Sequence, residues 1–422
     1  MFAALRHQEF RLLWIGWVLH NIGWWMQTFG LGWLVVQLAV RDGDGSRAAL
    51  YLGFVGLCRA VPGLMLGLVA GAYADRVERR RLMIVMQVVS MTLTALLAVV
   101  TLLDLVNLGL VLAISFGTAT AGLFDAPARQ SALSRLVPPR DIMSAIGLQN
   151  LAAHGTGVIG PAIGGLLIGP FGVAGLFFGN AGGYLPVIGA LILMRSLPPT
   201  EARRDLTVLR SIVEALRYVA QDPVIRWSFV IAGSTSLLAR PYLNLLPAFV
   251  ANALHRGPEV YSLLLSVTGV GAVLGALALA AAGSMERRGL LMIVASGVTG
   301  ALTVVVALQT SVEGTAVVSF GLGFTALWVM GLLSTVVQTT VPERLIGRVG
   351  SLNVMLFMVV MPVGQLLLGA LGSAFGVELS FALGGALTTL VAGYALWRVP
   401  YIRDLRMGVA RVPAEASATA GD

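Results

Sequence analysis

Apolar runs separated by short polar segments recur along nearly the whole chain, from Leu12 to Trp397. A helix needs about 20 apolar residues to cross the hydrocarbon core of a bilayer, and twelve runs come close to or exceed that length. The pattern therefore predicts an all-α membrane protein with twelve transmembrane helices. The predicted spans are Leu12–Leu38, Ala49–Ala72, Leu82–Leu103, Leu108–Ala126, Ile142–Ile168, Ala174–Met194, Val224–Ala251, Val260–Gly283, Leu290–Leu308, Gly314–Thr340, Val349–Gly372 and Glu378–Trp397.

The composition leads to the same class of protein. Of 422 residues, 57% are hydrophobic and only 11% are charged, whereas soluble domains carry roughly 25% charged residues. This deficit excludes a soluble enzyme and a disordered protein. A secreted disulfide scaffold is excluded as well, because Cys58 is the single cysteine. The first apolar run is too long for a signal peptide and lacks a cleavage site.

The positive charge comes from 28 arginines, since the sequence contains no lysine. Cytoplasmic loops of membrane proteins are enriched in basic residues. With the N-terminus inside, 23 arginines fall in cytoplasmic segments, including Arg129, Arg135 and Arg140 after the fourth span, and 3 fall outside. This asymmetry predicts a multi-pass membrane protein with both termini in the cytoplasm. It accounts for the net charge of +8 without nucleic acid as a partner.

Short motifs repeat at a constant spacing of 204 residues. Ser115–Gly117 recurs as Ser319–Gly321, and Phe171–Val173 recurs as Phe375–Val377. The offset places the fourth span on the tenth and the fifth on the eleventh, so each half has six helices. Parallel halves related by an axis along the membrane normal are a transporter architecture.

The repeat divides the chain into two six-helix bundles, residues 1–197 and 224–398, joined by a cytoplasmic linker at residues 198–223. Within the linker, Leu209, Ile212, Val213 and Leu216 recur at helical spacing. This spacing predicts an amphipathic helix that lies at the membrane surface. Residues 399–422 are expected to form a disordered cytoplasmic tail.

The segment Gly71–Arg81 resembles a motif of a known family. Its sequence, Gly-Ala-Tyr-Ala-Asp-Arg-Val-Glu-Arg-Arg-Arg, resembles the Gly-x-x-x-Asp-Arg-x-Gly-Arg-Arg loop of the major facilitator superfamily, with Glu78 where the family usually has glycine. Together with Phe10–Trp14 and Val341–Val349, it is similar to the bacterial drug–proton antiporter branch that contains the enterobactin exporter. The resemblance implies the major facilitator fold.

The same resemblance implies a conformational latch at the cytoplasmic side. In the family, the acid at Asp75 lies against the start of the eleventh span, here near Arg348–Gly350. The base at Arg79 bridges to a carboxylate at the end of the fourth span, which is Asp125. The latch holds the halves together when the cavity opens outward. The residues assigned to it are Gly71, Asp75, Arg76, Arg79 and Asp125.

The fifth span carries a second family-like motif at Gly160, Pro161, Gly164 and Gly165. It resembles the glycine–proline motif that marks antiporters, in which proline permits a helix bend. Tight helix packing by small residues is the alternative interpretation. The basic residue that many antiporters carry in the fourth span is missing from the predicted span.

Two arginines, Arg59 and Arg240, lie midway along the second and seventh spans. An arginine at the bilayer centre costs roughly 2.5–3.5 kcal/mol on insertion scales, so both are candidate ligand-binding residues. If they face the cavity, the cavity is electropositive and suits anionic ligands. The alternative is that they cap carbonyls freed by the nearby Pro62 and Pro241 or reach the membrane surface.

Other polar and aromatic residues within spans complete the candidate site. Histidine titrates near neutrality, so His20 or His154 is a candidate carrier of a coupled proton; a neutral, hydrogen-bonded histidine is the alternative. The aromatic residues are candidates for an amphipathic substrate. The remaining candidate substrate-binding residues are His20, Asn21, Trp24, Trp25, Tyr242 and Asn244.

No pattern for catalysis, metal or cofactor binding occurs. The four histidines are scattered, and without lysine there is no phosphate-binding loop of the ATPase type. Uphill transport would therefore depend on an ion gradient.

These observations predict a monomeric secondary transporter rather than an enzyme, with a small-molecule substrate, protons and the lipid bilayer as partners. It would export amphipathic drugs or metabolites by proton antiport with alternating access. An exporter of an anionic metabolite such as a siderophore is one alternative. A non-transporting membrane sensor or scaffold is the other.

Overall fold

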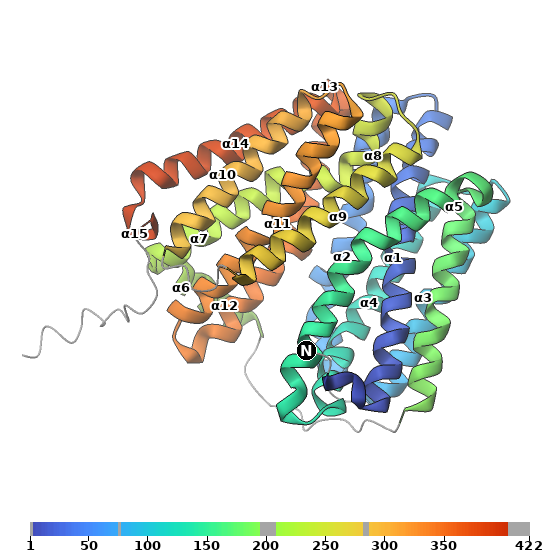
Figure 1. Ribbon diagram of the computed structural model, residues 1–422, viewed down its shortest axis with the longest axis horizontal. Coiled ribbons are helices and arrows are strands. Elements are labelled where there is room, and N and C mark those ends of the chain that lie inside the picture. The colour runs from blue at the N-terminus through green and yellow to red at the C-terminus, as the bar shows by residue number, and fades with distance from the viewer. Residues whose placement is uncertain (1–2, 75–76, 195–207, 282–286, 404–422) are drawn as a thin grey trace, which may run out of the picture.

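A computed structural model of the protein describes residues 3–74, 77–194, 208–281 and 287–403, nearly all of which are helical. Residues 3–194 form one bundle, here the N-half, and residues 208–403 form the second, the C-half. The bundles are inclined to each other (Figure 1): they meet at one end and separate toward the end where the N-terminus lies. We call the end where the N-terminus lies the linker end, and the end where the bundles meet the opposite end.

The N-half agrees with the predicted fifth and sixth spans and differs at the fourth. The fifth and sixth spans are two helices that share the label α5 and are separated by a kink at Gly172 (φ 62°), where the backbone leaves helical geometry. The fourth helix continues ten residues beyond the predicted Ala126, because helical geometry persists after the apolar run ends. The elements are η1 (Ala3–Arg6), α1 (Gln8–Arg41), η2 (Gly45–Arg47), α2 (Ala48–Ala74), α3 (Arg79–Leu102), α4 (Leu108–Leu136), η3 (Pro139–Asp141) and α5 (Ile142–Leu193).

The C-half begins with the linker helix α6 and then repeats the arrangement with more interruptions. Its elements are α6 (Val208–Gln221), α7 (Pro223–Ser234), η4 (Thr235–Ala239), α8 (Tyr242–Asn252), α9 (Pro258–Ala281), α10 (Arg288–Ala307), α11 (Val312–Thr340), α12 (Glu343–Met355), η6 (Leu356–Val360), α13 (Met361–Phe375), α14 (Val377–Arg398) and α15 (Pro400–Arg403).

The predicted seventh and eleventh spans are not continuous α-helices, because each contains a π-turn of five residues. The Arg240 N–H donates to the Thr235 carbonyl at 2.9 Å, and the Met361 N–H donates to the Leu356 carbonyl. Each turn ends two residues before a proline, Pro241 or Pro362, which lacks a backbone N–H and cannot continue the ladder. Such π-turns are frequent at functional sites.

The internal repeat is visible in the backbone. Gly172 and Gly376, which occupy equivalent positions, both adopt positive φ, at 62° and 94°. This conformation favours glycine because it has no Cβ. Each glycine joins two membrane-crossing helices at the opposite end, so the 204-residue spacing marks a repeated turn.

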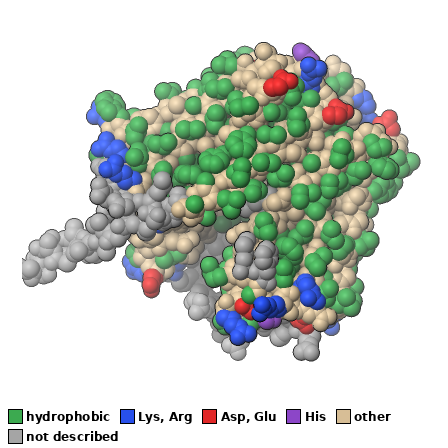
Figure 2. Space-filling view, in the orientation of Figure 1, with side chains coloured by type: hydrophobic (Ala, Val, Ile, Leu, Met, Phe, Trp, Pro, Cys, Tyr) green, Lys and Arg blue, Asp and Glu red, His purple; other side chains and the backbone are tan. Residues whose placement is uncertain are grey.

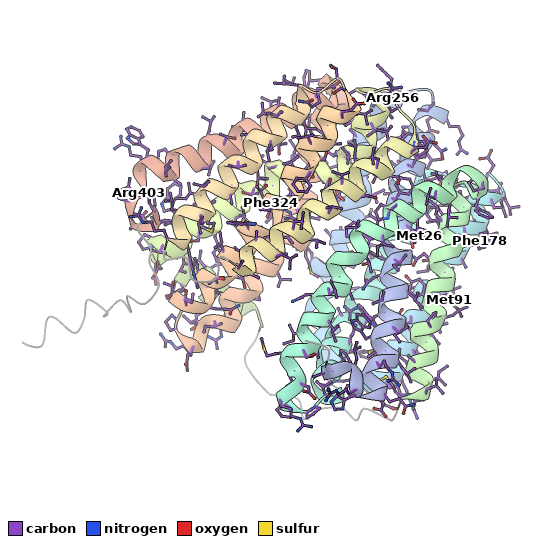
Figure 3. The ribbon with its side chains drawn as sticks, viewed as in Figure 1. Met26, Met91, Phe178, Arg256, Phe324 and Arg403 are labelled. Carbon is purple, nitrogen blue, oxygen red and sulfur yellow. The ribbon has the colours of Figure 1, made fainter. Side chains whose placement is uncertain are left out.

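Among the described residues, nine helices are long and apolar enough to cross a membrane. The stretch Pro139–Leu193 holds two crossings, one on each side of Gly172. Helix α1 and the α7–α8 pair supply the remaining two crossings of the twelve-span fold. Apolar side chains cover the middle of the molecule, with charged groups toward its ends (Figure 2). Arg256 and Arg403 lie at such ends (Figure 3).

The two halves contact each other toward the opposite end. Helix α2 crosses α13 closely: a Cβ on Gly53 would lie 2.9 Å from the Leu366 Cα, and one on Gly369 would lie 2.4 Å from the Ala49 carbonyl oxygen. Helix α5 crosses α9, where the Ser262 hydroxyl donates to the carbonyl of Pro161 at 2.8 Å. The space between the halves is therefore closed at this end.

The predicted disordered tail is shorter than expected. Residues Pro400–Arg403 form α15, because Ile402 is completely buried and its carbonyl packs against Gly289 at the start of α10. The rest of that prediction, residues 404–422, lies outside the described part of the chain.

Candidate functional site

A cavity with a volume of about 800 Å³ lies between the two halves; we call it the central cavity. It falls within the range of about 300–1,000 Å³ that is typical of small-molecule sites. Helices α1, α2 and α4 line it from the N-half, and α9 together with the residues around the two π-turns lines it from the C-half. Its wall extends from Leu52 near the opposite end to Gly67 and Ala126 toward the linker end.

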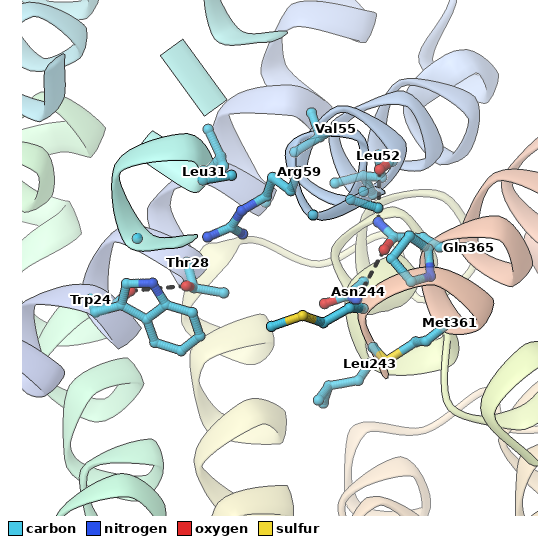
Figure 4. A pocket seen from close by; sticks show the side chains of 18 of the residues that line it. Trp24, Thr28, Leu31, Leu52, Val55, Arg59, Leu243, Asn244, Met361 and Gln365 are labelled. Atoms are coloured by element: carbon cyan, nitrogen blue, oxygen red, sulfur yellow. Dashed lines mark hydrogen bonds between the residues drawn. The ribbon is translucent and has the colours of Figure 1, made fainter. Parts of the chain in front are cut away.

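Arg59 reaches this cavity from α2 (Figure 4). Its guanidinium carbon lies 5.9 Å from the centre of the Trp24 ring, within the range of a cation–π contact. It has no hydrogen bond or ion pair with any part of the chain that the structure describes. The described residues that line the central cavity include no carboxylate. The cavity is therefore electropositive at Arg59.

Arg240 also lines the central cavity, but its guanidinium has a structural partner. Its Nη1 donates to the Ala326 carbonyl on α11 at 2.9 Å. This carbonyl belongs to another helix and is not one freed by Pro241, so the capping alternative stays untested; the bond leaves Arg59 as the stronger candidate for a ligand contact.

Further polar and aromatic groups line the central cavity. The Asn244 amide nitrogen donates to Gln365 Oε1 at 3.0 Å, and Gln365 Nε2 donates to the Leu52 carbonyl on the other half at 2.7 Å. Trp24 and Trp25 supply aromatic surface beside Arg59. The cavity thus combines two arginines, of which Arg240 is bonded to Ala326, with neutral amides and aromatic rings, which suits an amphipathic ligand.

A second cavity of about 590 Å³, the side cavity, lies entirely within the N-half. It adjoins the central cavity, because Trp24, Trp25, Arg59, Ala119 and Gly122 line both. His20 and Asn21, predicted as substrate-binding residues, line the side cavity and not the central one. The His20 ring packs against Tyr184, with 4.5 Å between ring centres.

Asp125 is the one carboxylate that lines the side cavity. It is 7% exposed and accepts a hydrogen bond of 3.2 Å from Gln87 Nε2 on α3. One turn later on α4, the Arg129 guanidinium lies 3.4 Å from the centre of the Trp17 ring. Arg129, predicted from the sequence to lie in a cytoplasmic segment after the fourth span, belongs to α4, so this helix carries a basic residue beyond its apolar run.

The predicted latch is only partly described. Asp75 and Arg76 lie outside the described residues, as do the surroundings of Gly71. Arg79 is 4% exposed at the start of α3, but the described contacts of Asp125 are with Gln87 and Arg129. Arg348 forms an ion pair with Glu214 of α6, within the C-half. The latch stays a prediction for the state that is closed at the linker end.

The glycine–proline motif of α5 lies at close helix crossings. A Cβ on Gly160 would lie 2.4 Å from the Trp25 Cβ, and one on Gly164 would lie 2.8 Å from the Phe29 ring. Gly165 lies against Ser262 of the C-half, and the Pro161 carbonyl accepts the Ser262 hydroxyl. These contacts fit the packing interpretation, while the break in α5 lies at Gly172.

Two further candidates do not line the central cavity. Tyr242 is buried in the core of the C-half, with its ring 6.4 Å from that of Phe381. His154 lies on α5, but its side chain is outside the described set. The proposed contact of Tyr242 with substrate therefore has no geometric support.

Sequence reasoning missed several cavity residues. Gln365, Gln87 and Tyr184 are single polar residues in apolar runs, and no spacing distinguishes them from helix-packing positions. Arg129 could have been found, because it lies one helical turn after Asp125 and a helix often continues past its apolar run.

A family model of the major facilitator superfamily, described as transmembrane secretion effector, matches residues 1–410. The multidrug efflux pump Tap of Mycolicibacterium fortuitum is 28% identical over 386 residues, covering 88% of this chain and 91% of Tap. The enterobactin exporter EntS of Citrobacter koseri is 30% identical over 339 residues, covering 76% of each chain.

Solved structures share the fold at low identity. A bacterial homologue of the human lysosomal transporter Spinster, in an inward-facing and unoccupied conformation, superimposes with a TM-score of 0.74 at 14% identity, covering 95% of this chain and 98% of that one. A POT family transporter in complex with 5-aminolevulinic acid superimposes with a TM-score of 0.71 at 11% identity, covering 93% and 96%. These similarities support the two-bundle transporter fold.

Proposed function

Because the chain belongs to the transmembrane secretion effector family of the major facilitator superfamily, we propose that this multi-pass exporter moves small amphipathic anions through its central cavity. The observation that carries the substrate class is Arg59, a cation on the cavity wall that contacts the Trp24 ring and has no hydrogen-bond or ion-pair partner among the described residues. Arginine does not lose its proton in proteins, so an acidic ligand is the group that would complete its interactions.

The aromatic wall beside Arg59 supports the amphipathic part of the proposal. Trp24 and Trp25 offer apolar surface, and Arg59 with Asn244 offers charge and hydrogen bonds. The relatives named as a multidrug efflux pump and an enterobactin exporter favour transport over a sensor or scaffold. Because one relative is named an enterobactin exporter, the proposed substrate class of small amphipathic anions includes siderophore-like anions.

We propose that the linker end faces the cytoplasm of a bacterial inner membrane. The N-terminal Arg6 and Arg11, the first residues of α3 and the arginines of α12 all lie at this end, as expected for cytoplasmic segments. In this orientation the central cavity receives its ligand from the cytoplasm. Rocking of two halves as a monomer would then expose it at the opposite end.

We further propose that protons flowing inward drive export, and that Asp125 carries them. His20, His154 and Asp125 are the candidates. His20 shares the side cavity with Arg129 and Arg59, whose positive charges oppose a third cation there. Protonation of a carboxylate changes its charge from negative to neutral, so it adds no positive charge beside the two arginines. Three buried polar atoms beside it, His20 Nδ1, Gln87 Oε1 and Arg129 Nε, have no described hydrogen-bond partner, which favours a hydrated route to Asp125.

Inverted membrane vesicles with an acidic lumen test the substrate class. Two dyes with the same xanthene ring system serve as probes: anionic fluorescein and a cationic rhodamine ester. We expect fluorescein to accumulate and the rhodamine ester to accumulate far less. Arg59→Gln should lower fluorescein uptake about tenfold or more, the value of one hydrogen bond to a charged group, and Arg59→Lys should retain part of it.

Equal uptake of both dyes, or an Arg59→Gln variant with normal fluorescein uptake, would refute the proposed substrate class. The energy source is tested separately, by adding an ionophore that collapses the pH gradient. Accumulation that persists without the gradient would exclude proton antiport while leaving the substrate class intact.

A further inference from the structure

A chain of hydrogen bonds joins the wall of the central cavity to the contact between the halves. Asn244 on α8 donates to Gln365 on α13, and Gln365 donates across the halves to the Leu52 carbonyl on α2. All three residues line the central cavity (Figure 4). This chain lies where the halves meet.

The Gln365 carboxamide is held in place by packing. Its side chain is 4% exposed, and it fits against Gly56 of α2, where a Cβ would lie 2.4 Å from Gln365 Oε1. Leu52 and Gly56 are one turn apart on α2, so the carboxamide spans one turn of the opposing helix. Any larger residue at Gly56 would displace it.

The same face of α2 carries Arg59, seven residues or about two helical turns after Leu52. A ligand bound to Arg59 therefore lies directly beside the Asn244–Gln365–Leu52 chain. Asn244 is half-buried and lies between Gln365 and the open part of the cavity (Figure 4).

This chain differs from the other described hydrogen bonds that cross the halves. Asn252 donates to the Gly45 carbonyl at 3.0 Å, and Ser262 donates to the Pro161 carbonyl. Neither Asn252 nor Ser262 lines the central cavity. Of the cross-half hydrogen bonds in the described residues, the bond from Gln365 alone is within reach of a ligand.

We propose that Asn244 and Gln365 are a ligand-responsive pair that determines when the opposite end opens. An anionic ligand on Arg59 accepts the Asn244 amide N–H, and Gln365 thereby loses its partner and releases the Leu52 carbonyl. In this arrangement Asn244 contributes to ligand specificity, while Gln365 is a positioning residue that acts through Leu52. The inference rests on the proposed function, because it takes the central cavity as the ligand site.

The physical reason is that two acceptors orient the same amide in different directions. A hydrogen bond to an ionised acceptor is roughly twice as strong as one between neutral groups, so a ligand carboxylate draws the Asn244 amide toward itself, and the N–H that bonds to Gln365 turns away from the Gln365 oxygen. The ligand then favours the open arrangement by its differential affinity for the two states. A ligand without an acceptor at this position would bind without opening the opposite end.

Distances across the opposite end provide the test. Nitroxide labels at Ser46→Cys and Arg256→Cys, in a Cys58→Ser background, report the separation of the halves by pulsed electron paramagnetic resonance in lipid nanodiscs. Ser46 is an exposed residue of η2 in the N-half, and Arg256 is an exposed loop residue of the C-half. Fluorescein and the rhodamine ester are again the probes, and fluorescein binding is measured in parallel by fluorescence anisotropy.

Two glycines on α2 provide a matched pair of variants. Gly56→Ala would displace the Gln365 carboxamide, whereas Gly63→Ala, on the same helix and also lining the cavity, would meet no atom within 4 Å. We expect fluorescein to increase the open fraction in the unsubstituted protein and in Gly63→Ala. In Gly56→Ala the open fraction should already be about 3- to 15-fold higher without ligand, the range of one interhelical hydrogen bond, and fluorescein should add little.

Gln365→Met provides the second variant, because it removes both hydrogen bonds and keeps the backbone contacts of α2 and α13. We expect it to match Gly56→Ala and to bind fluorescein at least as tightly as the unsubstituted protein, because a ligand that favours the open arrangement gains affinity when that arrangement is already populated. Asn252→Ala should also raise the open fraction but retain the response to fluorescein, since its bond does not face the cavity. These outcomes would support the pair as a sensor and not merely as a contact.

The failures are distinguishable. If fluorescein binds but opens Gln365→Met as it opens the unsubstituted protein, this inference is overturned and the proposed function stands. If fluorescein does not bind, or binds equally well to Arg59→Gln, the proposed substrate class fails first.

Discussion

The interiors of the two halves differ in chemistry although their folds repeat. In the N-half, Asp125 and Arg129 of α4 border the side cavity. The equivalent positions of α11, 204 residues further along, are Val329 and Leu333, which are fully buried in an apolar core. The C-half instead uses hydroxyl pairs between helices, such as Thr299 and Thr325, whose oxygens lie 2.9 Å apart.

This difference shows which parts of the repeat the fold requires. Turn glycines such as Gly172 and Gly376 are kept in both halves, because backbone geometry demands them. Interior side chains are free to diverge as long as each half packs. The N-half interior therefore holds two ionisable groups where the equivalent residues of the C-half, Val329 and Leu333, are apolar.

The largest effect, a loss of folding stability, is expected when the C-half receives a carboxylate at the position equivalent to Asp125. Val329→Asp buries a carboxylate in an apolar core without a partner, which costs about 3–5 kcal/mol of folding free energy. We expect most of this variant to aggregate, measured by fluorescence-detected size-exclusion chromatography with a temperature series. Val329→Ile is the control, and a Val329→Asp variant with normal thermal stability would mean that the C-half interior is hydrated.

The next effect concerns transport and not folding. Asp125→Asn keeps the shape of the side chain and its hydrogen bond to Gln87 but removes the charge. We expect normal thermal stability, while uptake driven by a pH gradient falls about tenfold or more, the size of general proton-transfer losses at such sites.

A second measurement identifies the step that fails in Asp125→Asn. Exchange of external dye for dye preloaded at equal pH needs the rocking motion but no proton, so it should persist. His20→Gln is the matched control from the same cavity and should retain gradient-driven uptake. Loss of exchange in Asp125→Asn would assign the residue to the conformational change, as the predicted latch implies.

The smallest effect is expected at the hydroxyl pair of the C-half. Thr299→Val removes the contact with Thr325 at nearly constant volume. Interhelical hydrogen bonds in membrane proteins contribute about 0.6 kcal/mol on average, so the melting temperature should fall slightly and transport should stay within about twofold. A large transport defect would show that the interiors of both halves take part in coupling.

Much of the fold could be predicted from the sequence, because membrane crossing is a matter of length and polarity. The twelve spans and the repeat follow from run lengths and constant spacing. The interruptions at Thr235–Ala239 and Leu356–Val360 could not be predicted, since a proline inside an apolar run permits a kink, a π-turn or an unbroken helix. Only the packing around Arg240 and Met361 selects among these.

The candidate site was predictable in part. Arg59 stands out because a charge inside an apolar run is costly, and that cost alone marks it. Gln365 does not stand out, because a neutral amide in a span is common, and its importance depends on a partner 313 residues away. Arg129 was assigned to a loop because its segment is polar, although Trp17 covers its guanidinium.

The sequence by itself determined that this chain crosses a membrane as two repeated six-helix bundles, because hydrophobic length, turn glycines and arginine asymmetry are local properties. The tertiary structure decided which polar groups share a cavity and which hydrogen bond holds the halves together. Those pairings depend on the angle and register at which distant helices cross. Helical periodicity gives the face on which a residue lies, but not the residue that it meets.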